Sequence, residues 1–111
     1  MPLSGLGVAF KQEKNLKIHM IFVILVSIAG VLLKISNTEW IICILLYGLV
    51  FVAELINTAI ESTVDLCSPE IKPLAKQAKD IAASCVLISA ITSIIIGIII
   101  FMPKILVYFK S

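Results

Sequence analysis

The segment AELINTAIESTVD, residues 53–65, places acidic and amide side chains in a stretch that is otherwise apolar. Its polar residues Glu54, Asn57, Glu61 and Asp65 are spaced three, four and four positions apart. On a helix this spacing puts all four side chains on one face. A carboxylate at membrane depth is costly, so it indicates a proton path, an ion site or a catalytic site.

The composition of the chain predicts a membrane protein. Of its 111 residues, 60% are hydrophobic and 14% are charged. A soluble domain of this size has too little interior to hide that much apolar surface. All basic residues are lysines, and the net charge is only +2, which argues against nucleic-acid binding. We therefore expect an all-α integral membrane protein with no nucleic-acid partner.

Three apolar runs predict three transmembrane helices, at residues 18–33, 40–60 and 81–102. The first run is slightly shorter than a hydrocarbon core of about 30 Å, so the lysines at its ends must extend toward the interfaces. Residues 34–39 are too few for anything but a tight helical hairpin. Ser36 or Asn37 can cap the helix that follows.

The remaining segments are more polar. Residues 1–17 combine apolar positions at near-helical spacing with lysines, which predicts an amphipathic helix lying in the membrane interface. Residues 65–80 predict a polar loop, because Pro69 and Pro73 interrupt helix. Pro103 is expected to end the third span.

The lysines predict the orientation of the chain. With three spans, the N-terminus and the 65–80 loop lie on the same side of the membrane. Six lysines fall on that side, namely Lys11, Lys14, Lys17, Lys72, Lys76 and Lys79. Because cytoplasmic segments are rich in lysine, we expect the N-terminus and the 65–80 loop to be cytoplasmic.

This topology gathers the groups that phosphoryl transfer requires. The reaction needs a divalent metal on the phosphates, positive charge for the developing oxyanion and an acceptor for the proton of the attacking hydroxyl. Glu13 and Glu61 fit the metal site, because carboxylates suit magnesium. Lys79 fits the positive charge. Glu54 fits the proton acceptor, since helical rise places it about 10 Å deeper than Glu61, where a lipid alcohol would lie.

Other interpretations of these residues remain open. Glu54 can be a buried structural acid paired with Asn57 or with a lysine of another helix. It can also be the carrier residue of an ion-coupled transporter subunit, and the whole chain can be a membrane scaffold without chemistry. Glu61 can be the solvated end of a helix, and Glu13 can form an ordinary surface pair with Lys17. His19, at the start of a span, is expected to be interfacial.

Several motifs resemble those of the small bacterial diacylglycerol kinase and undecaprenol kinase family. The chain carries ELINTAIE at 54–61 together with AKD at 78–80. It also has EKNLKIH at 13–19 and an uncharged last span. The resemblance extends from about Gly5 to Pro103.

The resemblance implies a role for each matching residue. It implies Glu54 as the base, Asn57 and Lys79 as further catalytic residues, Glu13 and Glu61 as magnesium ligands, and Glu70, Lys79 and Asp80 as contacts of ATP. Lys72, in the same polar segment, is placed with the nucleotide-binding residues, and contact with lipid headgroups or solvent is its alternative. The cofactor is therefore expected to be Mg²⁺, with ATP as co-substrate.

The resemblance also implies an assembly and a substrate. Members of the family are homotrimers of the bacterial inner membrane whose sites are shared between subunits. Asn15 and His19 are more similar to the undecaprenol kinase branch. We therefore expect a lipid kinase acting on undecaprenol, with diacylglycerol phosphorylation to phosphatidic acid as the alternative.

Overall fold

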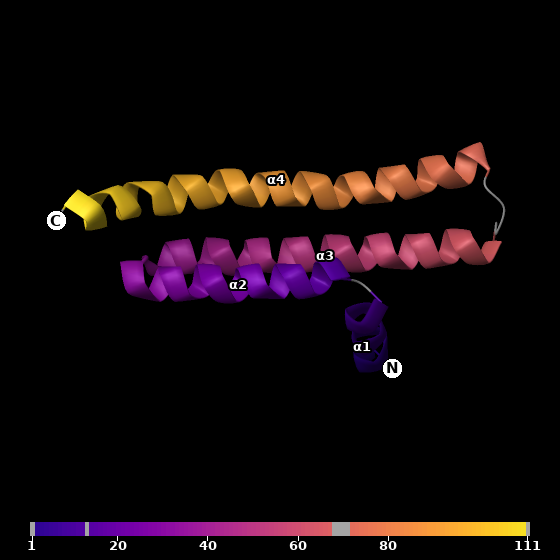
Figure 1. Ribbon diagram of the computed structural model, residues 1–111, viewed down its shortest axis with the longest axis horizontal. Helices are drawn as coiled ribbons and strands as arrows, with labels where there is room; N and C mark the ends of the chain where they lie inside the picture. Colours follow the sequence, from indigo (N-terminus) through magenta and orange to yellow (C-terminus); the bar gives the residue numbers. More distant parts are fainter. Residues whose placement is uncertain (1, 13, 68–71, 111) are drawn as a thin grey trace.

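The computed structural model describes residues 2–12, 14–67 and 72–110, and every element in these ranges is a helix. In chain order the helices are α1 (Pro2–Gln12), α2 (Lys14–Leu33), α3 (Asn37–Cys67) and α4 (Pro73–Lys110) (Figure 1). The expected all-α architecture is therefore confirmed for the described part of the chain.

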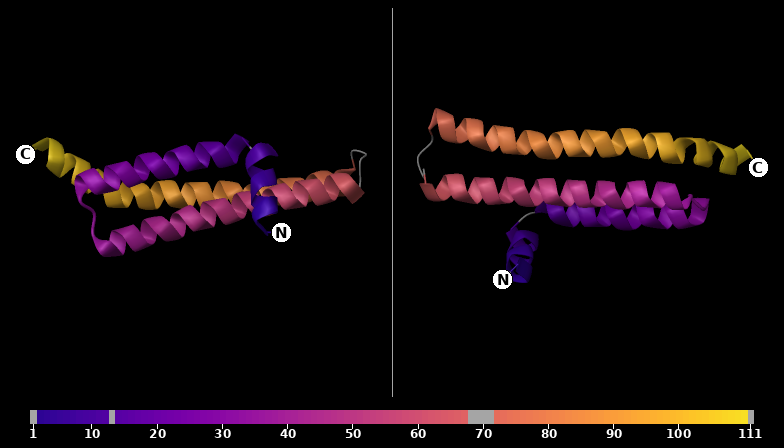
Figure 2. Two further views of the ribbon diagram at one scale, coloured as in Figure 1. Left: turned by 90° about the horizontal axis from the view of Figure 1, so that it is seen from below. Right: turned by 180° about the vertical axis from the view of Figure 1, so that it is seen from behind.

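The three long helices lie side by side, and α3 contacts both α2 and α4 (Figures 1 and 2). The short helix α1 lies crosswise to them, next to the start of α2, and it contacts α2 and α3. It ends at Gln12, and α2 already begins at Lys14, so the change of direction comes earlier than the predicted 1–17 boundary. The joined ends of α3 and α4 project beyond both α1 and the start of α2.

The three long helices can each cross a membrane. Helix α3, helix α4 and residues 16–33 of α2 are long and apolar enough for this. Large apolar side chains are exposed along all three, for example Ile24, Leu45 and Ile99 at 53%, 68% and 65%. Water would make so much exposed apolar surface unfavourable, whereas lipid tails cover it. The chain is a multi-pass membrane protein.

Helix α2 is followed, at the turn to α3, by a residue in the left-handed conformation. Lys34 has a φ of 54°, and it is the one non-glycine residue with positive φ in the described ranges. Its N–H donates to the carbonyl of Val31 at 3.3 Å, and the N–H of Ile35 donates to the carbonyl of Gly30 at 3.1 Å. This pattern is a Schellman motif, and it satisfies carbonyls that would otherwise be left open at the helix end.

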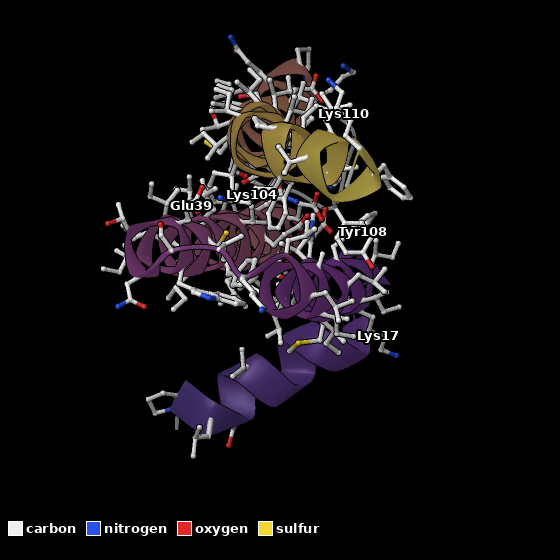
Figure 3. All side chains as sticks on the ribbon, turned by 90° about the vertical axis from the view of Figure 1, so that its left-hand side faces the viewer. Lys17, Glu39, Lys104, Tyr108 and Lys110 are labelled. Atoms are coloured by element: carbon white, nitrogen blue, oxygen red, sulfur yellow. The ribbon has the colours of Figure 1, made fainter. Side chains whose placement is uncertain are left out.

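The next helix begins with a capping box. The backbone N–H of Glu39 donates to Ser36 Oγ at 3.2 Å, and the N–H of Ser36 donates to Glu39 Oε1 at 2.9 Å. Of the two predicted caps, the structure uses Ser36. Lys104 of α4 also lies 3.1 Å from Glu39 Oε1, so this carboxylate joins α3 to α4 (Figure 3).

The polar segment 65–80 is mostly helical, and the prediction of a loop was wrong there. Helix α3 continues to Cys67, and α4 starts at Pro73. Proline fits the first turn of a helix, because its fixed φ suits the helix and its missing N–H would have no helical partner there. The first helical bond of α4 runs from the N–H of Lys76 to the carbonyl of Lys72, at 3.0 Å. Pro69 lies outside the described residues.

Pro103 does not end the third long helix, contrary to the prediction. It lies inside α4, which continues to Lys110. Membrane helices tolerate proline, because neighbouring groups and small local adjustments satisfy the freed carbonyl. The yellow C-terminal end of α4 bends away from the axis of the rest of the helix (Figure 2, left), as a proline in a helix commonly causes.

The buried apolar cluster lies at the end of the bundle that contains the α2–α3 turn. It consists of Ile35, Cys43 and Ile100, with Trp40 and Tyr47 among the residues packed against it. Trp40 also covers Gly30 of α2 so closely that a Cβ there would lie 2.8 Å from a ring carbon. The absence of a side chain at Gly30 therefore lets α2 and α3 meet at this end.

Gly30→Ala is expected to destabilise the protein, because the new methyl group meets the Trp40 ring and lies 3.1 Å from Ile35. Gly97→Ala is the matched control, since a Cβ at Gly97 meets nothing within 4 Å and both changes raise helix propensity equally. We expect the two variants to differ by about 1–3 kcal/mol in unfolding free energy, measured by thermal unfolding in micelles. Equal stability of the two would contradict this packing.

Candidate active site

Glu54 is the most deeply buried acidic residue that the structure describes, with a relative exposure of 1%. It lies on α3, on a buried helix face that also includes Val50, Ala53 and Asn57. These positions follow the i, i+3, i+4, i+7 pattern of a face turned toward neighbouring helices. The sequence therefore placed Glu54 and Asn57 on one face correctly, and the structure adds that this face is buried.

His19 of α2 contacts Glu54. Its Nε2 lies 3.0 Å from Glu54 Oε1, across 35 positions of sequence. The side chain of His19 is 22% exposed, so the pair connects a buried carboxylate with a more accessible imidazole. The prediction that His19 is interfacial did not include this contact with Glu54. No local pattern could reveal this contact, because it depends on how α2 lies against α3.

One oxygen of Glu54 and one oxygen of Asn57 have no hydrogen-bond partner among the described residues. Asn57 Nδ2 donates to Glu61 Oε1 at 3.3 Å, one helical turn along α3. Asn57 Oδ1 and Glu54 Oε2 are buried and accept no hydrogen bond. A buried acceptor without a donor is unfavourable. These two atoms therefore mark a place where a donor or a cation from another molecule would be stabilised.

The joined ends of α3 and α4 carry two exposed ion pairs. Lys79 of α4 pairs with Asp65 near the end of α3. Asp65 is the last of the four polar residues predicted on one face of that helix, and Lys79 is the lysine predicted to contact phosphate. Lys76 pairs with Asp80 at 2.7 Å, at i,i+4 spacing. Sequence reasoning did not anticipate the Asp65–Lys79 contact, although both residues were expected at the same membrane face. Exposed pairs of this kind contribute little to stability, because water screens both charges, and they rearrange easily.

Two predicted site residues, Glu13 and Glu70, lie outside the described residues. Lys72 is exposed and immediately precedes α4. Within the described ranges, no three His, Cys, Asp or Glu side chains cluster as a metal site. Magnesium does not require such a cluster, because it commonly takes one or two protein carboxylates together with phosphate and water. The half-buried Glu61 carboxylate suits that requirement.

An apolar groove of about 530 Å³ runs between the three long helices. Among the residues that line it are Val23 and Val26 of α2, Leu46 of α3 and Gly97 of α4. His19 is also part of its lining, and of the lining residues on α2 it lies nearest the N-terminal end of that helix. The groove thus leads to the imidazole that contacts Glu54.

Comparison with known proteins places this arrangement in a family. Residues 1–101 match the family model described as prokaryotic diacylglycerol kinase. An undecaprenol kinase of Bacillus subtilis is 46% identical over 100 residues, covering 90% of this chain and 81% of the relative. A diacylglycerol kinase of Synechocystis is 38% identical over 93% of this chain and 59% of the relative. A diacylglycerol kinase of Helicobacter pylori is 38% identical over 79% of this chain and 69% of the relative.

These matches cover nearly the whole chain, including the helices that carry Glu54, Asn57, Glu61 and Lys79. The family model alone extends over more than half of the residues. The family resemblance expected from the motifs is therefore confirmed. The chain belongs to the prokaryotic diacylglycerol kinase family.

Proposed function

We propose that this chain transfers the terminal phosphate of ATP to the hydroxyl of a lipid alcohol, with undecaprenol favoured over diacylglycerol. The observation that carries the proposal is the buried Glu54 carboxylate, whose Oε2 atom has no partner in residues 2–12, 14–67 and 72–110. Lipid kinase activity follows from the family and from the names of the relatives. The preference for undecaprenol is supported by the 46% identity to a relative with that activity in its name.

The surroundings of Glu54 suit a lipid alcohol. An apolar groove leads to His19, which contacts Glu54, so a hydrocarbon chain can stay among apolar side chains while its hydroxyl approaches the carboxylate. Glu54 Oε2 is free to accept the hydrogen of that hydroxyl. As the hydroxyl oxygen attacks phosphorus, its proton passes to the carboxylate, which is general base catalysis.

The Asn57–Glu61 pair suits the metal that this chemistry needs. Glu61 would hold Mg²⁺ together with Glu13, and Asn57 would orient Glu61 through its amide. When bound, the metal would neutralise charge on the transferred phosphoryl group. Oxygen ligands are those that magnesium prefers, and both proposed ligands are carboxylates.

The charged ends of α3 and α4 suit the nucleotide. Lys79 would turn from Asp65 toward the phosphates, and an exposed ion pair is weak enough to allow it. Glu70, Lys72 and Asp80 are proposed as further contacts of ATP. Because these ends project beyond α1, a water-soluble nucleotide can reach them if α1 lies in the membrane interface.

We further propose that the protein is a homotrimer of the bacterial inner membrane, with α1 in the interface and the α3–α4 connection in the cytoplasm. The excess of lysine near that connection supports the orientation. The exposed apolar faces of the three long helices leave room for neighbouring subunits as well as lipid. The unpartnered acceptors of Glu54 and Asn57 also allow a group from a second subunit to complete the site.

Purified protein in micelles with Mg²⁺ and labelled ATP is expected to phosphorylate undecaprenol faster than diacylglycerol at equal mole fraction. Lipid extraction and chromatography would measure both products. Faster phosphorylation of diacylglycerol would overturn the substrate preference. Failure with both lipids, from folded protein, would overturn the lipid kinase proposal and favour an ion-coupled transporter.

Glu54→Gln is expected to lower kcat by a factor on the order of 10²–10⁴, because the amide cannot accept the proton of the lipid hydroxyl. The variant should keep the oligomeric size of the parent protein in detergent. Glu39→Gln is the matched control on the same helix, since Glu39 lies at the opposite end, next to Lys104. Substantial activity in Glu54→Gln would exclude Glu54 as the base.

Glu61→Gln is expected to raise the Mg²⁺ concentration needed for half-maximal activity by about 10- to 100-fold, because the metal loses one charged ligand. A magnesium titration of the initial rate would measure the shift. An unchanged magnesium requirement would remove Glu61 from the metal site.

A further inference from the structure

The His19–Glu54 contact engages only one of the two oxygens of the buried carboxylate. Glu54 is 1% exposed, and His19 Nε2 is the partner that the structure gives to its Oε1. The second oxygen, Oε2, is buried and accepts no hydrogen bond within the part of the chain that the structure describes. One side of the carboxylate is thus held, and the other is open to a donor that the described residues do not supply.

A carboxylate held in this way has a defined direction. The terminal torsion of glutamate is broad, so an unheld carboxylate samples many orientations. A hydrogen bond to Oε1 restricts that torsion and also offsets part of the cost of burying the charge. With Oε1 held by His19, the remaining acceptor is Oε2, on the opposite side of the carboxylate carbon.

We propose that His19 is a positioning residue for phosphoryl transfer: its Nε2–H group holds Oε1 of Glu54 and so turns Oε2 toward the lipid hydroxyl. This inference rests on the proposed function. The proton of the hydroxyl passes to Oε2 as the lipid oxygen bonds to the γ-phosphorus and the bond from that phosphorus to the bridging oxygen of ADP breaks. His19 itself transfers no proton in this step. An imidazole with hydrogen on Nε2 can donate the hydrogen bond in its neutral form and in its charged form.

The place of His19 in the bundle fits this role. The ring lines the apolar groove where the groove approaches Glu54. A donor supplied from α2 fixes the carboxylate of α3, so the orientation of Glu54 depends on the packing of these two helices. Asn57, on the same helix as Glu54, directs its amide to Glu61 instead.

Three substitutions separate a hydrogen-bonding role from a packing role. In His19→Gln the side-chain amide nitrogen can reach the position of Nε2, whereas in His19→Asn it falls short, and His19→Leu has no donor. We expect kcat to fall by about 10- to 100-fold in the Asn and Leu variants, with the KM values for ATP and lipid changed less than about twofold. His19→Gln should recover most of the kcat.

The outcomes are distinguishable from a failure of the proposed function. If the parent protein phosphorylates no lipid, the proposed function fails. If the parent is active and His19→Asn and His19→Leu match its kcat, or His19→Gln is no better than His19→Leu, the positioning role fails. Thermal unfolding of all three variants identifies a loss of folding, and the comparison of Gln with Asn remains valid when Leu does not fold.

A spectroscopic measurement tests the contact without turnover. The chain has a single histidine, so the imidazole nitrogen signals of ¹⁵N-labelled protein belong to His19. We expect Nε2 to carry hydrogen in the parent protein and its chemical shift to move in Glu54→Gln. A non-protonated Nε2, or a shift that Glu54→Gln leaves unchanged, would overturn the proposal.

Discussion

A carboxylate inside an apolar bundle is tolerated only when other groups compensate for the loss of water. Glu54 meets this constraint in part, through the imidazole of His19 at one of its two oxygens. Burying this carboxylate without a donor would be unfavourable, and the donor comes from α2. The contact therefore requires α2 to lie close to α3. The same cost also explains why a hydrogen-bond donor from another molecule would be stabilised at Oε2, which accepts no hydrogen bond from the described residues. Under the proposed function, the same side chain therefore affects both stability and substrate binding.

The sequence predicted the helical architecture well, because three apolar runs of sufficient length have few alternatives in a membrane. It predicted helix ends less well. Pro73 and Pro103 predict breaks in helix, yet one starts α4 and the other lies within it. Proline is compatible with a first turn and with a membrane helix, and composition alone does not distinguish these cases from a break.

The candidate site was predictable to the extent that it follows helical spacing. Glu54, Asn57 and Glu61 lie on one helix, so counting residues was enough to group them. The contacts of His19 with Glu54 and of Asp65 with Lys79 join different helices. Their formation depends on the offset and rotation of one helix against another, and a single sequence does not specify these quantities. Glu13 and Glu70 lie outside the described residues, so their predicted roles stay predictions.

The two ends of the bundle are held in different ways. At the α2–α3 turn, Glu39 joins the start of α3 to Lys104, next to a buried apolar cluster. At the other end, α3 and α4 meet through exposed ion pairs. Helical rise separates Lys104 from Lys79 by roughly 37 Å along α4. The exposed side chains at the charged end can therefore exchange partners without any repacking of the apolar cluster at the other end.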